Sequence, residues 1–317
     1  MDLQKILETK VESLQAGPHS DGFRAVRIHI DAAVRHLKRG QADDETAFTD
    51  AIYRCNQAFE GSLKEAFRVL AGKDPAKKSI AQIEEFLTSG GVLRTKVLNQ
   101  LTNYRTAWRN PSTHQYTLDF DEDEALLAIV SVTAFAIVLC DQVVGKLAYD
   151  AAEAVGKTVP RNEKFGSLLE QVSKLLIRFG SNVDYKASPR GSAFSEYEVH
   201  GAMAGFLAAE LDAGADIRVE EITDDGSLID ILVTSSNEQV GVELRLSRHK
   251  SPLNAQMDSG LRYASIVKRD AGVSGVVLMM LSPEKTSYET IELKQDFVAV
   301  APQAWQNRLR ERADLLS

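Results

Sequence analysis

Apolar residues recur at helical spacing along roughly the first half of the chain. Residues three and four positions apart lie on one face of a helix, so this spacing predicts a series of amphipathic helices. The predicted helices cover about residues 3–11, 26–40, 45–70, 80–87, 92–108 and 122–155. Pro111 lacks an amide proton and restricts the preceding residue, which predicts that the fifth helix ends at about Asn110.

The most apolar run in the sequence lies at the start of the sixth helix, from Ala125 to Cys140. It is shorter than the ~18 residues expected of a membrane span, and Ser131 and Thr133 interrupt it. The acidic residues before it suit a helix N-terminus, where the macrodipole favours negative charge. We expect a central core helix here and no membrane association.

The periodic pattern breaks near Thr158-Val159-Pro160, which predicts a boundary between domains of residues 1–158 and 159–317. A short helix follows over about residues 164–179, then a polar Gly/Ser/Pro-rich loop over 180–195 and a helix over 196–213. Beyond it, alternating and buried-type runs predict strands at 217–222, 228–234, 239–246, 275–281 and 297–300. Helices are expected over 253–268 and 302–316. The fold class is therefore an all-helical bundle followed by an α/β domain with the element order α-β-β-β-α-β.

Composition narrows the classes of function. The chain has 317 residues, is 44% hydrophobic and carries a formal net charge of −8. A protein that depends on broad attraction to nucleic acid is usually basic, so any contact with RNA or DNA should be local. Cys55 and Cys140 lie in apolar helical context, and the first residues contain no apolar signal core. These features indicate a cytoplasmic protein with two buried thiols.

A chemically suggestive segment follows the fifth helix. Arg109, Asn110 and His114 occur within six residues, on either side of Pro111. RNA cleavage by its own 2′-hydroxyl needs a base, an acid and positive charge on the phosphate. Histidine titrates in the required range and arginine grips phosphate oxygens with a fixed fork. If the two side chains converge across the proline turn, they suffice for this chemistry.

The segment resembles the Rx4-6H signature of HEPN ribonucleases, and the all-helical context over about residues 40–150 is similar to that family's bundle. The resemblance implies metal-independent cleavage of RNA by a homodimer, often in toxin–antitoxin, abortive-infection or other antiviral defence systems. It makes Arg109 and His114 catalytic, with Asn110 and Glu60 in supporting roles. Arg105, one turn before Arg109, is a further candidate for phosphate binding. Two alternatives stay open: the motif residues are a helix cap and a solvated histidine, or the domain serves only assembly, as some HEPN domains do.

The second half carries a different pattern. Asp230 lies on one predicted strand, and Glu243 and Arg245 lie on the next. Residues two apart on a strand share a face, so Glu243 and Arg245 point the same way, and Asp230 meets them if the strands pair. Two carboxylates on one sheet edge are suitable ligands for Mg²⁺. The arrangement resembles the PD-(D/E)xK restriction-endonuclease fold, in which Glu196 or Glu198 is the helix carboxylate.

The chain departs from this second family at one position. The family's lysine is Arg245 here, and arginine stays charged where lysine can lose its proton. The alternative to metal-dependent cleavage is that Glu243 and Arg245 form a salt bridge. The domain would then bind DNA, another nucleic acid or a protein partner without cutting. The sequence thus leaves three hypotheses: a metal-independent ribonuclease with a C-terminal binding domain, a Mg²⁺-dependent DNA nuclease with a helical dimerisation domain, and a non-catalytic interaction protein.

Overall fold

The computed structural model divides the chain into two compact units, Met1–Lys146 and Leu147–Ser317. It describes residues 2–14, 16–114, 119–156, 166–182, 195–212, 214–223, 226–247, 252–282 and 284–315. The domain boundary predicted between residues 158 and 159 therefore lies outside the described residues, as does most of the loop predicted over 180–195. The fold class predicted from the sequence, a helical bundle followed by an α/β domain, is confirmed.

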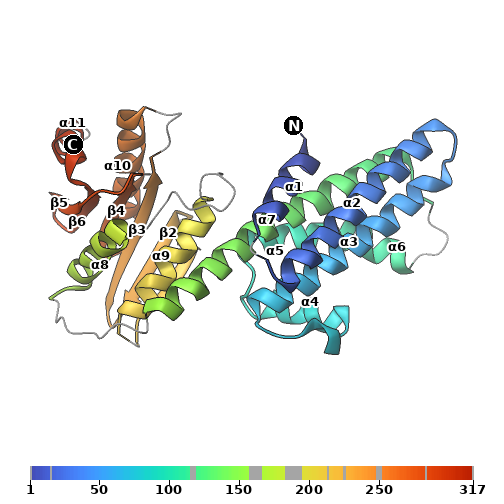
Figure 1. The fold of residues 1–317 in the computed structure, drawn as a ribbon, viewed down its shortest axis with the longest axis horizontal. Coiled ribbons are helices and arrows are strands. Elements are labelled where there is room, and N and C mark those ends of the chain that lie inside the picture. Colours follow the sequence, from blue (N-terminus) through green and yellow to red (C-terminus); the bar gives the residue numbers. More distant parts are fainter. Residues whose placement is uncertain are drawn as a thin grey trace. The chain divides into compact units, whose positions relative to one another are not determined.

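The first unit is a bundle in which α2 and α3 pack along their length (Figure 1). Its elements are α1 (Leu3–Ser13), α2 (Pro18–Ala42), α3 (Thr46–Leu70), η1 (Pro75–Lys77), α4 (Ile80–Ser89), α5 (Thr95–Tyr104), η2 (Arg105–Arg109), α6 (Asn110–His114) and the first part of α7 (Glu122–Gly156). Apolar stripes predicted from the spacing face the centre, where the Phe59 ring lies 4.8 Å from Tyr104 and 5.4 Å from Phe135 between ring centroids.

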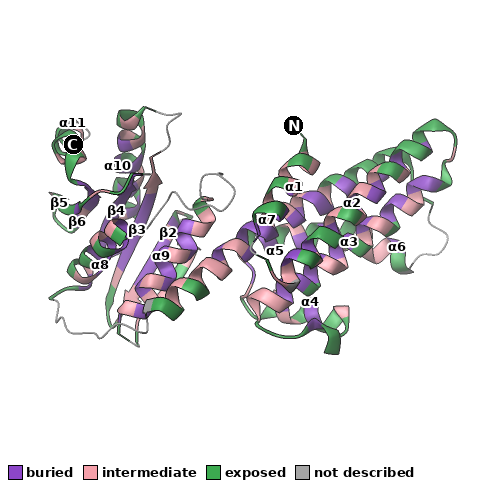
Figure 2. Ribbon diagram, viewed as in Figure 1, coloured by how far each residue is buried: buried purple, intermediate pink, exposed green. Residues whose placement is uncertain are grey.

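Helix α7 carries the apolar run and continues from the first unit into the second. It is long and apolar enough to cross a membrane, but 56% of its most apolar window is buried inside the structure. Such burial agrees with a core helix, and Figure 2 shows buried positions along it. Asp121 precedes the first residue of the helix and caps its N-terminus: its Oδ1 accepts a hydrogen bond from the Glu124 amide at 2.9 Å.

The helix that carries the Arg109 segment does not end at Pro111. The backbone passes through α5, the wide turn η2 and α6 without leaving helical geometry. In η2 the Asn110 amide donates to the carbonyl of Arg105, five residues earlier, which is the spacing of a π-helix. In a regular α-helix the ring of Pro111 would collide with the carbonyl four residues earlier. The wider turn makes room for that ring, so the predicted helix end at about Asn110 is wrong.

The second unit is a six-stranded mixed sheet between two layers of helices (Figures 1 and 2). Its strands are β1 (Asp216–Ile222), β2 (Leu228–Ser235), β3 (Glu238–Leu246), β4 (Gly275–Leu281), β5 (Tyr288–Lys294) and β6 (Phe297–Pro302), in the spatial order β1-β2-β3-β4-β6-β5. β3, β4 and β6 are parallel to one another, and the remaining neighbours are antiparallel. Helices α8 (Leu168–Asn182) and α9 (Glu196–Glu210) cover one face, and α10 (Leu253–Asp270) and α11 (Gln306–Leu315) cover the other.

Two details differ from the elements predicted for this unit. Strand β5 was not predicted, because its buried residues Tyr288 and Ile291 are three positions apart and a bulge near Lys294 disturbs the alternation. The closing helix begins at Gln306 and not at Pro302, which ends β6 and is followed by a 3₁₀ turn, η3 (Gln303–Trp305). The element order that positions Asp230, Glu243 and Arg245 agrees with the prediction.

Candidate functional sites

Arg109 is the last residue of the π turn, and its guanidinium has acidic and amide neighbours. Its Nη2 lies 3.9 Å from Glu60 Oε1, and its Nη1 donates to Asn110 Oδ1 at 3.3 Å. The side chain is 19% exposed, while its Nε is buried and has no hydrogen-bond partner among the described residues. The supporting positions predicted for Asn110 and Glu60 therefore do contact Arg109. A ligand can reach only the exposed part of this side chain, since the Nε is buried.

A second carboxyl group, Glu84 of α4, belongs to the same electrostatic cluster. It is buried, and its Oε1 has no hydrogen-bond partner among the described residues. Burial raises the pKa of Glu84, the charges of Arg105 and Arg109 lower it, and the charge of Glu60 raises it further. Arg105, the predicted additional phosphate ligand, thus lies within electrostatic reach of this carboxyl group and belongs to the same cluster.

The backbone around Arg109 is tied to α3 by a chain of side-chain hydrogen bonds. The buried Tyr104 hydroxyl donates to Asn56 Oδ1 at 3.0 Å, and Asn56 Nδ2 donates to Ser112 Oγ at 2.8 Å. The Ser112 hydroxyl in turn donates to the Arg109 carbonyl at 3.1 Å. The exposed Thr113 hydroxyl donates to the same carbonyl at 2.8 Å. The bonds through Tyr104, Asn56 and Ser112 thus connect the Arg109 backbone to the buried side of the turn.

His114 is the last residue of α6, and its side chain lies outside the described part of the structure. Its backbone is separated from Arg109 by a continuous helical path and not by the loop-like proline turn that the sequence suggested. The convergence of the two side chains stays a prediction.

In the second unit the predicted acidic pair is assembled by the pairing of β2 and β3. The antiparallel register joins Ile231 to Val242, which sets Asp230 and Glu243 at neighbouring positions. Asp230 Oδ2 accepts a hydrogen bond from the Leu244 amide at 2.8 Å. Arg245 Nη1 lies 3.6 Å from Asp230 Oδ2 and 4.0 Å from Glu243 Oε2. The three residues singled out in the sequence therefore meet.

Burial dominates the electrostatics of this pair. Glu243 is fully buried, and its carboxyl group lies beside the backbone and the side chain of Asp230. Burial, reinforced by the charge of Asp230, raises the pKa of Glu243 to about 9, against the opposing charge of Arg245. Burial also raises the pKa of Asp230, while His200, the Leu244 amide and Arg245 lower it. Burial and mutual repulsion therefore favour a protonated form of this pair.

The pair also provides carboxyl oxygen atoms on neighbouring strands, and such oxygen atoms are the ligands that Mg²⁺ prefers. In the described part of the chain, no group of three His, Cys, Asp or Glu side chains collects around a common point. Asp230 and Glu243 would therefore hold such an ion as a pair, with water completing its octahedral shell.

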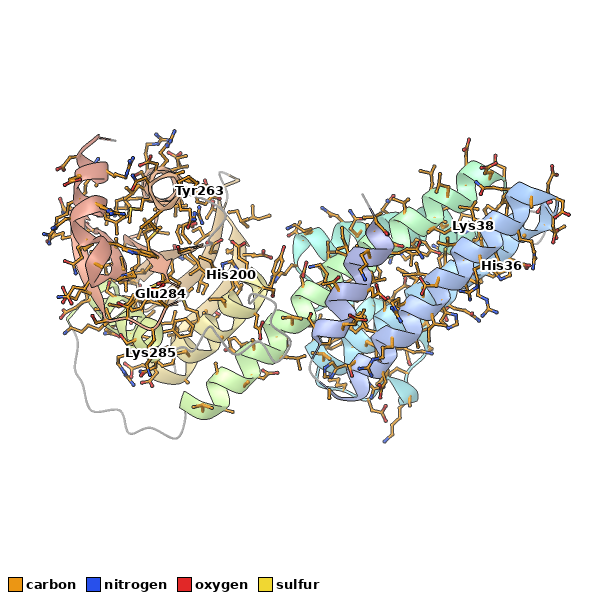
Figure 3. The ribbon with its side chains drawn as sticks, turned by 45° about the horizontal axis from the view of Figure 1, so that its top comes forward. His36, Lys38, His200, Tyr263, Glu284 and Lys285 are labelled. Carbon is orange, nitrogen blue, oxygen red and sulfur yellow. The ribbon has the colours of Figure 1, made fainter. Side chains whose placement is uncertain are left out.

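Helices on both faces of the sheet add residues that the sequence pattern did not reveal. His200 of α9 is buried, and its Nε2 lies 3.7 Å from Asp230 Oδ2. The ring centre of Tyr263, on α10, lies 5.4 Å from the guanidinium carbon of Arg245. Figure 3 labels both His200 and Tyr263. Of the two predicted helix carboxylates, Glu196 raises the pKa of Asp230 through its charge. Burial raises the pKa of Glu198, with no Asp230 contribution. His200, four residues after Glu196, could have been sought on the same helix face.

Two of the missed residues share a signal. Asn56 and Glu84 are polar residues on otherwise apolar helical stripes: Ile52 and Phe59 flank the first, Ile80 and Leu87 the second. A polar residue on a buried face needs a partner, which marks it as a candidate for a site.

Comparison of the chain with protein-family models, with curated proteins and with solved structures finds no match.

Proposed function

We propose that the first unit is a metal-independent endoribonuclease of the HEPN type, with Arg109 as phosphate ligand and His114 as proton-transfer residue. The observation that carries this proposal is the position of the Arg109 side chain: it is partly exposed, and Glu60 and Asn110 orient its guanidinium. A guanidinium that is fixed in place and partly exposed is suited to binding a phosphate oxygen.

The reaction that fits these residues is transesterification within the RNA. The 2′-oxygen attacks the adjacent phosphorus and loses its proton to a base, and the bond from phosphorus to the 5′-oxygen breaks. That leaving oxygen takes up a proton, which yields a 2′,3′-cyclic phosphate and a 5′-hydroxyl. Imidazole can exchange protons in either direction near neutral pH, and Arg109 would stabilise the charge that develops on the phosphorane.

The wider setting belongs to the same proposal and derives from the family resemblance. We infer a cytoplasmic homodimer that acts in a defence or toxin–antitoxin system, with the second unit binding a nucleic acid or protein partner. The net charge of −8 argues against a general nucleic-acid interface, so contact with RNA would be confined to groups such as Arg105 and Arg109, at the two ends of η2.

The test is digestion of total RNA with and without EDTA. We expect cleavage by the wild type in EDTA, with losses of about 10²–10³ in rate for Arg109→Ala and about 10²–10⁴ for His114→Ala. Arg24→Ala is the matched control, because Arg24 is an exposed arginine of the same unit that pairs with Asp21. Cleavage that survives in Arg109→Ala, or that requires a divalent metal, would contradict the assignment. Absence of cleavage with an intact dimer would favour an interaction protein.

The acidic pair Asp230–Glu243 favours a second candidate function, a Mg²⁺-dependent DNA nuclease in the second unit. Support comes from the α-β-β-β-α-β order and from two acidic groups beside a basic residue on adjacent strands. Mg²⁺ would supply electrostatic stabilisation of the phosphate. We expect EDTA and Asp230→Ala to abolish such cleavage, and Arg245→Lys, which restores an ammonium group, to increase it. DNA that stays intact with both the wild type and Arg245→Lys would exclude this candidate.

A further inference from the structure

The side-chain amide of Asn56 contacts both ends of the π turn that carries Arg109. Its Oδ1 accepts from Tyr104, the residue immediately before η2, and its Nδ2 donates to Ser112, which follows Pro111. Each amide atom therefore holds a different flank of the same turn. The hydroxyl of Ser112 extends the connection to the carbonyl of Arg109 itself.

The turn needs such support because a π turn is an uncommon, weakly bonded stretch of helix. Pro111 adds to the weakness, since it provides no amide proton to the helix. Without contacts from outside the helix, the segment Arg105–His114 could shift toward other helical hydrogen-bond patterns, and each pattern would point Arg109 in a different direction.

The hydrogen-bond chain has a fixed direction that suits an asparagine in particular. The Ser112 hydroxyl donates to the Arg109 carbonyl and must therefore accept from Asn56. The Tyr104 hydroxyl donates to the opposite amide atom. An aspartate could not donate to Ser112, and it would place a charge beside the fully buried Tyr104. Only a side chain with one donor and one acceptor completes both contacts.

We propose that Asn56, with Tyr104 and Ser112, forms a positioning strap that fixes the π turn and thereby the direction of the Arg109 guanidinium; as a role in catalysis this rests on the proposed ribonuclease function. The three residues do not touch the substrate. They act through the backbone of Arg109, so their loss should lower kcat for RNA more than it raises KM.

The experiment combines kinetics with amide hydrogen exchange in the full-length chain. Tyr104→Phe and Ser112→Ala each remove one hydroxyl and leave the packing nearly unchanged. We expect each to lower kcat by about 10- to 100-fold, as displacement of a reacting group by about 1 Å does, with KM within about twofold. The exchange of the Asn110 amide, which bonds to the Arg105 carbonyl across the turn, should accelerate about fivefold.

Two further variants separate positioning from general destabilisation. Ser112→Thr keeps a hydroxyl and should retain most of the wild-type kcat, whereas Ser112→Ala should not. Tyr53→Phe removes the hydroxyl of an exposed tyrosine on the same helix α3 and should change neither kcat nor the exchange of Asn110.

The readouts distinguish failure of the strap from failure of the ribonuclease proposal. If the wild type cleaves RNA but Tyr104→Phe and Ser112→Ala match it in kcat, the strap is overturned while the ribonuclease stands. If the wild type does not cleave RNA, the catalytic role falls with the proposed function, and the exchange of Asn110 alone decides whether the strap fixes the turn. Acceleration confined to η2 and α6 supports it, and unchanged exchange overturns it.

Discussion

The Nη1 atom of Arg245 lies 3.6 Å from Oδ2 of Asp230, so strand β3 places a cation beside the acidic side chain of its neighbour β2. The same atom lies 4.0 Å from Glu243. One guanidinium thus offsets part of the negative charge of two neighbouring carboxyl groups, of which Glu243 is fully buried.

Removal of Arg245 should destabilise the second unit. In Arg245→Ala the acidic pair loses its nearest described cation, and we expect a loss of about 1–3 kcal/mol in the free energy of unfolding at pH 7. Urea unfolding followed by Trp305 fluorescence, in a Trp108→Phe background, reports on this unit alone because the chain has two tryptophans. Arg262→Ala on the exposed face of α10 is the control. Equal losses in both variants would show that the charge near Asp230 is not responsible.

Glu243 should make the stability of the second unit fall with rising pH. Its pKa is raised from 4.5 to about 9 in the folded state, so the folded chain holds a proton that the unfolded chain releases. Stabilisation by that proton is fully present below about pH 4.5 and is lost as pH rises to about 9, by at most about 1.4 kcal/mol per pH unit.

Glu243→Gln tests this dependence, because an amide cannot take up or release the proton. The same urea measurement, repeated from pH 5 to pH 9, should show a flatter profile for the variant than for the wild type. Parallel profiles would mean that Glu243 does not hold the proton. The control Glu289→Gln, at an exposed position on β5, should retain the wild-type slope.

On the proposed ribonuclease function, neutralising Glu84 should strengthen the binding of RNA. Above its raised pKa this buried carboxylate competes with phosphate for the charge of Arg105 and Arg109. Glu84→Gln removes the competing charge, so KM for RNA should fall severalfold at pH 8, with the difference shrinking as pH falls and Glu84 takes up a proton. The exposed neighbour Glu85 gives the matched control, Glu85→Gln. An unchanged KM in Glu84→Gln would separate Glu84 from the phosphate site.

Gly205 should tolerate no side chain. A Cβ at this position of α9 would lie 2.2 Å from the backbone carbonyl oxygen of Tyr149 at the end of α7. A backbone atom cannot move aside as a flexible side chain can, so Gly205→Ala should lower the stability of the second unit by about 1–3 kcal/mol. Gly214→Ala, where a Cβ meets nothing within 4 Å, should leave stability unchanged. Thermal unfolding of both variants is the measurement. Equal midpoints would contradict the close approach of Gly205 to the Tyr149 backbone.

Much of the fold could be predicted because its signals are periodic and local. Helical spacing located most helices of the first unit to within a few residues, and the alternation in β2 and β3 brought Asp230 toward Glu243. The end of the helix at Pro111 was mispredicted because the rule for proline assumes a regular α-helix, and a π turn suspends that assumption. No periodic signal in a single sequence marks such a turn.

The candidate sites show the same difference between local signals, which could be predicted, and tertiary contacts, which could not. Residues joined by strand pairing, such as Glu243 and Arg245, could be placed together from the sequence. Partners that arrive from other helices could not, because no spacing relates His200 to Asp230 or Asn56 to Ser112. What the sequence did offer was the polar character of Asn56 and Glu84 on apolar stripes, a sign that a tertiary partner exists but not which one.

The π turn also sets the rotational phase of everything that follows it in the helix. Each residue in an α-helix advances the side-chain direction by about 100°, and a π turn behaves as one extra residue inserted into the regular ladder. If the turn closed as an ordinary α-helix with all its residues kept, Ser112 would rotate by about 100° and lose its direction toward Asn56. Deleting Ala107 would instead turn the bond from the Asn110 amide to the Arg105 carbonyl into a regular one and leave Ser112 in its present phase. The motif therefore depends on one residue that does not belong to it, because that residue sets the direction in which the later helix presents its side chains.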